Sequence, residues 1–377
     1  MVATLLPLYV VYILNEGVDK LGVVIAVATF VSYFFRILFG YLSDRFGLVK
    51  PLVVIGYLIS AITKPLLAFT HTYQGVAALR GLERIGKAVR SAPKDALISA
   101  YSADKQSGKA FGFHKTMDVA GELGGAIFIL LLLVWLSPSA ENFRVIFAMT
   151  LFPGLIATFI AWFFVNDIPP PLHTAEIQKP AIKVLDRRDL RLMPLIAIYV
   201  FAVFFMLSDQ FLLVAAKGHG YELSFMPLFV IVLTLTQFLT SYASGVAGDR
   251  MGSGPMLLIA FVFGCASVAA LWQGLLWFSF IALGLFTVIS LNAMRAYIAH
   301  YAKSQGFIFG ILYGGVAFFG AAGALVMGQL WQRLGFDFAM MFALAGMLAL
   351  TIVLAAWTVF QYRMRKQKNA IDQPGVS

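Results

Sequence analysis

The chain has 377 residues, of which 60% are hydrophobic and 12% are charged, and its mean hydropathy is +0.86. Soluble domains carry roughly 25% charged residues, so this composition excludes a soluble globular protein. The formal net charge of +10 would suit a nucleic-acid partner, but the basic residues are scattered between apolar runs and are better interpreted as topology signals.

Apolar stretches of about 18–25 residues recur along the chain, each long enough to cross a hydrocarbon core of about 30 Å. Lipid offers no partner to open backbone groups, so these stretches must be helices. Their continuous Phe-rich character lacks the two-residue alternation of an outer-membrane barrel. We therefore expect an all-α membrane protein with twelve transmembrane helices. The predicted spans are 1–14, 21–42, 51–69, 73–100, 109–136, 143–165, 193–216, 224–247, 255–273, 276–301, 306–333 and 337–361.

The first span is shorter than the others. At 1.5 Å per residue, Met1 to Leu14 covers about 21 Å, which is too little for the bilayer. It shows neither the basic start nor the cleavage site of a signal peptide. We expect the first helix to be truncated, either because the true start lies upstream of Met1 or because the helix is clipped.

The basic residues between the spans sort onto one side. By the positive-inside rule this side is cytoplasmic, which places both termini in the cytoplasm. We expect the membrane to be a bacterial inner membrane. The only long connector, 166–192, contains three consecutive prolines and mixed charges, as expected of a solvated linker. The predicted division is a six-helix half at 1–165, this linker, a second six-helix half at 193–361 and a tail at 362–377.

The two halves contain related motifs. The octapeptide from Gly40 to Gly47 recurs from Gly245 to Gly252, in each case between the second and third helix of its half. A second pair, Gly108–Gly112 and Gly306–Gly310, opens the fifth helix of each half. Such repeats are typical of transporters, in which the substrate lies near the midplane between the halves. The residues shared by the first pair are Gly40, Asp44, Arg45 and Gly47 in one copy and Gly245, Asp249, Arg250 and Gly252 in the other.

The fourth span carries a charged stripe within an arc of about 120° on a helix. Each charge at the bilayer centre costs about 2.5–3.5 kcal/mol even on the lenient scale, so the stripe must face a hydrated cavity or buried partners. Its members are Arg80, Glu83, Arg84, Lys87, Arg90 and Lys94.

The fifth span offers partners for this stripe. His114, Asp118 and Glu122 are spaced by four residues and share one helix face. We expect Asp118 to lie level with Lys87 or Arg90, and Glu122 with Arg84. These groups could form a purely structural network of ion pairs, or at least one of them could contact the substrate or take up protons. The two roles are compatible, because ion pairs that break in one conformation can act as a switch.

The second half has fewer ionisable candidates. Asp209 is the only acid expected to be buried there, and burial favours the neutral form of a carboxyl group, which suits a proton carrier. The alternative is a carboxylate held by ordinary hydrogen bonds near the non-cytoplasmic mouth. Asn292 and Arg295 are the other polar candidates, although Arg295 also fits a cytoplasmic-end anchor.

Three further residues suggest only structural roles. Arg36 and Lys64 are expected to extend their charged ends to the membrane interface. Cys265, the single cysteine, lies in an apolar run and is expected to pack inside a helix; no disulfide within the chain is possible. Metal-ligand spacing, cofactor motifs and enzymatic motifs are absent from the sequence, so neither a cofactor nor catalysis is expected.

The segment 40–47 resembles the loop signature Gly-x-Leu-Ala-Asp-Arg-x-Gly-Arg-Lys of the major facilitator superfamily, matching at Gly40, Leu42, Asp44, Arg45 and Gly47. Leu48 and Val49 replace the basic pair. The resemblance extends through 80–98, 108–118, 208–213 and 294–296 to a bacterial subgroup of exporters of unassigned solute. It implies two pseudo-symmetric halves, a latch at Asp44 that holds the outward-open state, and proton coupling at Arg80.

We therefore expect a monomeric transporter that exports a small organic solute in exchange for protons and uses the proton gradient as its driving force. The cationic excess of the fourth span suggests an anionic or zwitterionic solute. The antiporter Gly-Pro motif is absent from the fifth span, which shows only Gly121, Gly124 and Gly125. The alternatives are an importer of a nutrient or siderophore and a non-transporting receptor or scaffold.

Overall fold

The computed structural model describes residues 2–46, 48–101, 107–136, 138–167, 187–303 and 305–371. These residues form helices and short connections, with no strand among them, so the prediction of an all-α membrane protein is confirmed. In the described chain, ten helical segments are long and apolar enough to cross a membrane. The first predicted span is shorter than these, and the fourth is more highly charged.

The described part of the first half contains seven α-helices and two short irregular helices. Close glycine contacts hold some of them together: a Cβ added at Gly56 would lie 2.6 Å from the carbonyl oxygen of Gly86, so α3 and α4 touch along their backbones. The elements are α1 (Val2–Leu8), η1 (Tyr9–Ile13), α2 (Val18–Phe46), α3 (Lys50–Leu66), η2 (Leu67–Phe69), α4 (Tyr73–Tyr101), α5 (Ser107–Trp135), α6 (Ala140–Met149) and α7 (Leu151–Phe163).

The second half repeats this arrangement after the short helix α8. Its last helix continues past the predicted end at 361, into the segment expected to be a tail. The elements are α8 (Arg187–Leu190), α9 (Met193–Phe205), α10 (Asp209–Gly218), η3 (Leu223–Phe225), α11 (Met226–Met251), α12 (Ser253–Trp272), α13 (Leu276–Tyr301), α14 (Gln305–Leu334) and α15 (Phe336–Ile371).

One predicted span is broken in the middle. The segment 193–216 was expected to be one continuous helix, but α9 ends at Phe205 and α10 begins at Asp209. Met206 and Ser208 have extended backbone conformations between them. The break places the first turn of α10 deep inside the protein.

The two bundles converge at the ends of the helices remote from the linker. There, a Cβ added at Gly22 of α2 would lie 2.6 Å from the carbonyl oxygen of Ala324 of α14. The backbone N–H of Val18 donates to Oε1 of Gln332 at 3.0 Å, and the Tyr12 hydroxyl donates to the Val214 carbonyl at 2.9 Å. The halves are therefore closed on the side away from the linker.

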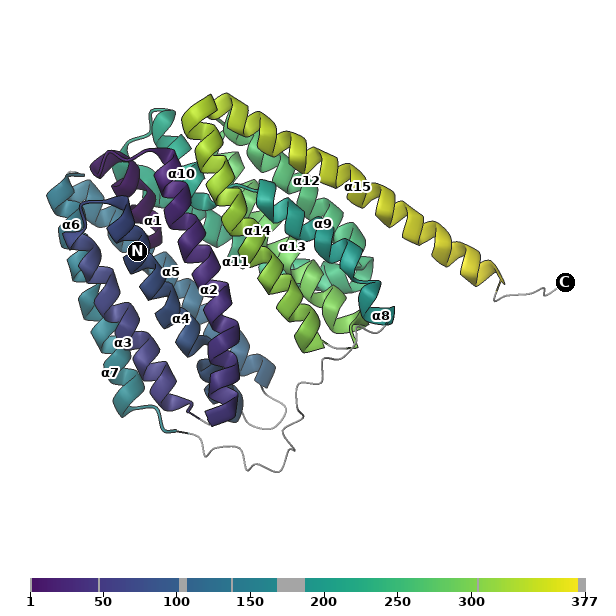
Figure 1. Ribbon diagram of the computed structural model, residues 1–377, viewed down its shortest axis with the longest axis horizontal. Coiled ribbons are helices and arrows are strands. Elements are labelled where there is room, and N and C mark those ends of the chain that lie inside the picture. Colours follow the sequence, from purple (N-terminus) through teal and green to yellow (C-terminus); the bar gives the residue numbers. More distant parts are fainter. Residues whose placement is uncertain are drawn as a thin grey trace.

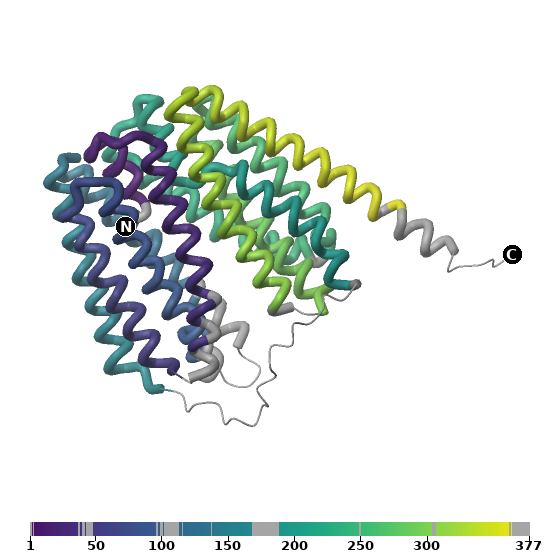
Figure 2. The backbone as a smooth tube through the Cα atoms, in the orientation of Figure 1, coloured from purple at the N-terminus to yellow at the C-terminus, as the bar shows by residue number. Residues whose placement is uncertain are grey.

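Figure 1 shows the helices of the first half, in purple and blue, beside those of the second half, in teal to yellow. In the same orientation, the Cα tube of Figure 2 shows α2 and α14 close together at the end remote from the linker and diverging toward the linker. The site described next lies between these two bundles.

Candidate functional site

A cavity of about 540 Å³ lies between the two halves. Helices α1, α2, α4 and α5 contribute lining residues from the first half, and α9, α10, α11, α13 and α14 contribute them from the second. The cavity therefore lies at the interface between the halves, and its shape must change if one half moves relative to the other.

Cationic groups of the first half face this cavity. Arg84 and Lys87 come from the predicted stripe of α4, and Arg36 comes from α2, so the expectation that Arg36 extends to the membrane interface is wrong. The Nε atoms of Arg36 and Arg84 are buried and lack hydrogen-bond partners. Because a buried unpaired donor is costly, these atoms favour an incoming acceptor such as a carboxylate or phosphate oxygen.

Two carboxyl groups, one from each half, face the same space. Glu122 of α5 and Asp209 of α10 both line the cavity, and Asp209 lies within electrostatic reach of Glu122 and Arg84. Across the described part of the chain, no ion pair within 4.0 Å involves Arg84, Lys87, Glu122 or Asp209. These charges are thus available to a solute or to protons.

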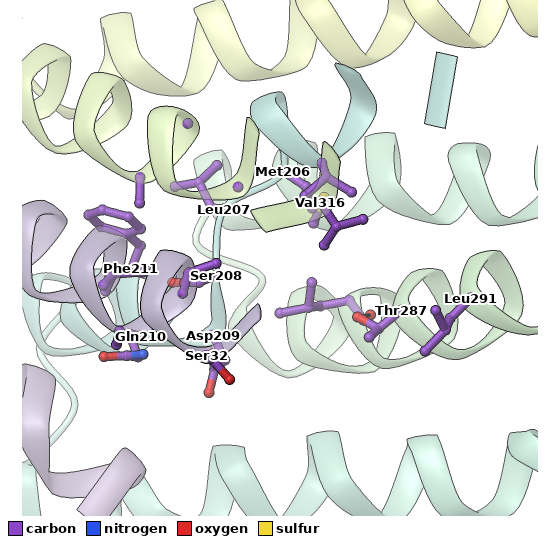
Figure 3. A pocket seen from close by; sticks show the side chains of 18 of the residues that line it. Ser32, Met206, Leu207, Ser208, Asp209, Gln210, Phe211, Thr287, Leu291 and Val316 are labelled. Atoms are coloured by element: carbon purple, nitrogen blue, oxygen red, sulfur yellow. Dashed lines mark hydrogen bonds between the residues drawn. The ribbon is translucent and has the colours of Figure 1, made fainter. Parts of the chain in front are cut away.

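The break between α9 and α10 opens into this cavity (Figure 3). Gln210 is only 9% exposed, and its Oε1 atom has no partner; the hydroxyl oxygen of Ser208 is also buried and unpartnered. Asp209 is the acidic residue in the first turn of α10, a favourable position for negative charge. The broken helix therefore presents hydrogen-bonding groups that a continuous helix would place elsewhere.

A pair of tyrosines joins the two halves. The rings of Tyr33 and Tyr313 stack with centroids 6.1 Å apart, and the Arg36 guanidinium lies 5.7 Å from the centre of the Tyr33 ring. In the second half, Nε of Arg295 donates a hydrogen bond to the Tyr313 hydroxyl at 3.1 Å. Arg295 thus supports a cavity-lining residue without lining the cavity itself.

The remaining charges of the α4 stripe lie away from the cavity. Arg80 is 2% exposed and pairs with Glu83 one turn along the helix. Lys64 of α3 lies 4.0 Å from Glu83, so the expectation that it extends to the interface is wrong. The Arg90 guanidinium donates to Ser60 Oγ at 3.0 Å.

The predicted lattice between α4 and α5 does not form among the described side chains. Asp118 is 58% exposed and lies 3.6 Å from His114 on its own helix, while Arg90 and Lys94 lie only within electrostatic reach of it. Asn292 donates to Ser244 Oγ at 2.9 Å and ties α13 to α11. Asn292 is therefore a packing contact in this conformation.

Comparison with known proteins decides the family. The family model described as Major Facilitator Superfamily matches residues 1–234, which is more than half of the chain. The chain belongs to the Major Facilitator Superfamily. It is 28% identical over 345 residues to an uncharacterised MFS-type transporter of Methanocaldococcus jannaschii, covering 88% of this chain and 84% of that protein.

Solved structures of this superfamily have the same fold. The nucleoside transporter NupG, in the form of a point mutant, has a TM-score of 0.80 at 15% identity, covering 94% of each chain. The xylose transporter XylE from E. coli, in a partially occluded inward-open conformation, has a TM-score of 0.67 at 14% identity, covering 94% of this chain and 92% of that one. The protein is therefore a multi-pass membrane transporter of the MFS fold.

The MFS latch motif falls mostly on positions that the structure does not describe. Gly47 lies outside the described residues, and the side chains of Asp44, Arg45 and Asp249 do too. Gly40 lies in α2 and Gly245 in α11, while Arg250 and Gly252 lie at the junction of α11 and α12. The role of the motif as a latch therefore stays a prediction.

Sequence reasoning missed the contribution of α2 to this MFS cavity. Thr29, Ser32, Tyr33 and Arg36 all line it, and their spacing of three and four residues places them on one helix face. That polar stripe was visible in the sequence, although it lies among phenylalanines. The helix break also had a signal, because Ser208 followed by Asp209 resembles a helix N-cap inside an apolar run.

Proposed function

We propose that this protein is a proton-coupled secondary transporter that exports a small organic anion or zwitterion by alternating access. The observation that carries the proposal is the inter-half cavity, in which Arg84 and Lys87 face Asp209 with no ion pair among the described side chains. Unpaired charges of both signs in a membrane protein favour a ligand that pairs with them.

The cationic groups support an acidic substrate. Arg36, Arg84 and Lys87 come from neighbouring helices of one half, and two of them have buried donor atoms without acceptors. A carboxylate or phosphate group satisfies such donors by charge-assisted hydrogen bonds. The volume of about 540 Å³ is typical of pockets for small organic molecules.

The carboxyl groups support proton coupling. Glu122 and Asp209 belong to opposite halves and are close enough to influence each other electrostatically. Carboxyl groups inside the membrane form the proton relays of pumps and transporters. The ammonium group of a zwitterion is also attracted to these two carboxyl groups. Competition between that ammonium group and a proton for the carboxyl groups is a simple mechanism for exchanging solute against protons.

The orientation follows from the distribution of basic residues. With the linker and both termini in the cytoplasm of a bacterial cell, the closed side of the structure faces outward and the conformation is inward-facing. The resemblance to exporters favours outward transport by a monomer. A D-xylose–proton symporter has the same fold, with a TM-score of 0.67, so the fold alone does not set the direction of transport.

The deciding experiment uses purified protein in proteoliposomes of known sidedness. Candidate solutes are first selected by their increase in apparent melting temperature. Each solute is then tested for transport and for solute-dependent proton movement with an internal pH dye. We expect opposite movement of solute and protons. Solute uptake with proton symport indicates an importer, and binding without flux of either species indicates a receptor; both outcomes contradict the proposal.

A further inference from the structure

A second large pocket lies in the C-terminal half, away from the central cavity. Its volume is about 760 Å³, and it is formed where α8, the α11–α12 turn, the end of α13 and the segment 357–361 of α15 meet. In Figure 1, α8 lies beside the linker end of the second bundle, and α15 runs along that bundle's edge. The pocket therefore opens at the linker-side boundary of the membrane-spanning region.

The lining of this pocket is basic, and no acidic side chain of the described residues contributes to it. Arg188 and Arg191 are exposed and contribute their positive charges, and His300 adds a third nitrogen-containing group. The nearest acid in the sequence, Asp189, is 1% exposed and accepts a hydrogen bond from the backbone N–H of Lys303 at 2.9 Å, so it is already engaged. The pocket thus favours an anion.

Aromatic side chains also line the pocket. Trp357 of α15 and Tyr301 at the end of α13 both line the pocket. Tryptophan and tyrosine are enriched at the height of lipid head groups, because each combines an apolar ring with one polar atom. Gly254 of α12 packs against this wall, since a Cβ added there would lie 3.8 Å from the Trp357 ring.

The first half contains a related pocket at the corresponding place. That pocket has a volume of about 540 Å³ and lies between α3, α4, α5 and α7, where Tyr101 ends α4 as Tyr301 ends α13. Its walls are mainly apolar, with Lys94 and His114 as its basic groups. Each half therefore has a pocket at the linker-side membrane boundary. The pocket of the second half is lined by two arginines, whereas the described lining of the first-half pocket has none.

We propose that the pocket between α8, α12, α13 and α15 binds the head group of an anionic phospholipid. Arginine pairs with phosphate through two parallel hydrogen bonds, and basic pockets between transmembrane helices suit anionic head groups. A soluble phosphate would fill only part of 760 Å³, whereas a head group with its glycerol reaches both the arginines and the aromatic wall. Because α8 follows the linker, a bound lipid would tie the end of the linker to the second half.

The test measures lipid binding directly and is independent of transport. Purified protein in detergent is mixed with phosphatidylglycerol, phosphatidylethanolamine or inorganic phosphate, and bound molecules are counted by native mass spectrometry. We expect wild type to retain phosphatidylglycerol selectively. Arg188→Gln and Arg191→Gln should each weaken that retention about fivefold, as expected for the loss of one basic contact at a membrane surface.

Lys50→Gln is the matched control, because Lys50 opens α3 on the linker side of the other half and does not line this pocket. It should leave selective retention unchanged, and all variants should elute as the wild type does in gel filtration. Equal retention of both lipids, or unchanged selectivity in the arginine variants, overturns the proposal. Displacement of phosphatidylglycerol by millimolar inorganic phosphate identifies a soluble anion as the ligand and also overturns it.

Discussion

Arg84 of α4 and Asp209 of α10 lie on opposite halves of the protein, line one cavity and are within electrostatic reach of each other without forming an ion pair. The attraction between the two side chains therefore favours the approach of the halves. A charged solute bound between them changes the equilibrium between the open and closed arrangements of the halves. The central site consists of side chains whose partners are supplied by the solute, by protons or by the other half.

Lys87 and Arg90 provide a matched pair for separating binding from stability. Lys87→Gln should abolish solute-induced thermal stabilisation while leaving the melting temperature of the free protein unchanged, because Lys87 lines the cavity and forms no ion pair with the described side chains. Arg90→Gln should lower stability by about 2 kcal/mol, since Arg90 donates to Ser60 and lies 4.3 Å from the Tyr57 ring centre. Thermal scans with and without solute check both effects, and a reversed pattern contradicts the assignment.

Asp209 is predicted to couple solute movement to protons. Asp209→Asn should eliminate transport driven by a pH gradient, because the amide cannot exchange a proton, while solute exchange across the membrane without a gradient should persist. The measurement compares both activities in the same proteoliposomes. Glu222→Gln is the control, since Glu222 is an exposed acid outside the cavity. Retention of gradient-driven transport by Asp209→Asn would remove this residue from the coupling mechanism.

The glycine contact between α2 and α14 is predicted to stabilise the closure remote from the linker. Gly22→Val should destabilise this conformation by about 1–3 kcal/mol, because the side chain would meet the Ala324 carbonyl. That energy corresponds to a population shift of roughly 5- to 150-fold. Labelling of a cysteine at Thr4, which lines the cavity, should then increase from the closed side in a Cys265→Ser background.

Gly310→Val on α14 is the matched control, because a Cβ at Gly310 meets nothing within 4 Å. It should leave labelling at Thr4→Cys unchanged. Equal labelling in both valine variants would show that the Gly22 contact does not determine which side is closed.

The two copies of the loop motif are predicted to act on the opposite side. By resemblance, Asp44 holds the linker side closed, so Asp44→Asn should increase the fraction of molecules open toward the linker, and Asp249→Asn should act in the same direction. Distances between spin labels on the linker-side ends of α2 and α14 measure this fraction. A shift toward the linker-closed conformation in Asp44→Asn contradicts the prediction.

Hydropathy was sufficient to predict ten of the spans, because the cost of exposing backbone to lipid leaves helices as the solution for each apolar stretch. It could not predict the break after Phe205, since Met206 and Leu207 are as apolar as the helix before them. Only the polar sequence beginning at Ser208 indicated a new helix start, and the tertiary structure had to supply the cavity into which it opens.

The charged stripe of α4 shows a similar limit. Helical periodicity placed Arg84, Lys87 and Arg90 on one side, but an arc of about 120° reaches both the cavity and the neighbouring helix α3. Packing against α3 at Gly56 and Ser60 then determines that Arg90 is structural. Sequence periodicity identifies the polar face of a helix, whereas its division between two neighbours depends on the fold.

Transport by the proposed mechanism requires that Lys87 face a hydrated cavity that opens alternately to the two sides of the membrane. The most direct measurement is the labelling of Lys87→Cys, in a Cys265→Ser background, with a membrane-impermeant thiol reagent applied to one side at a time. We predict labelling from the linker side in the free protein and labelling from the other side when the linker side is closed. A cysteine at this position that resists water-soluble reagents from both sides but reacts with a lipid-soluble one would contradict the account.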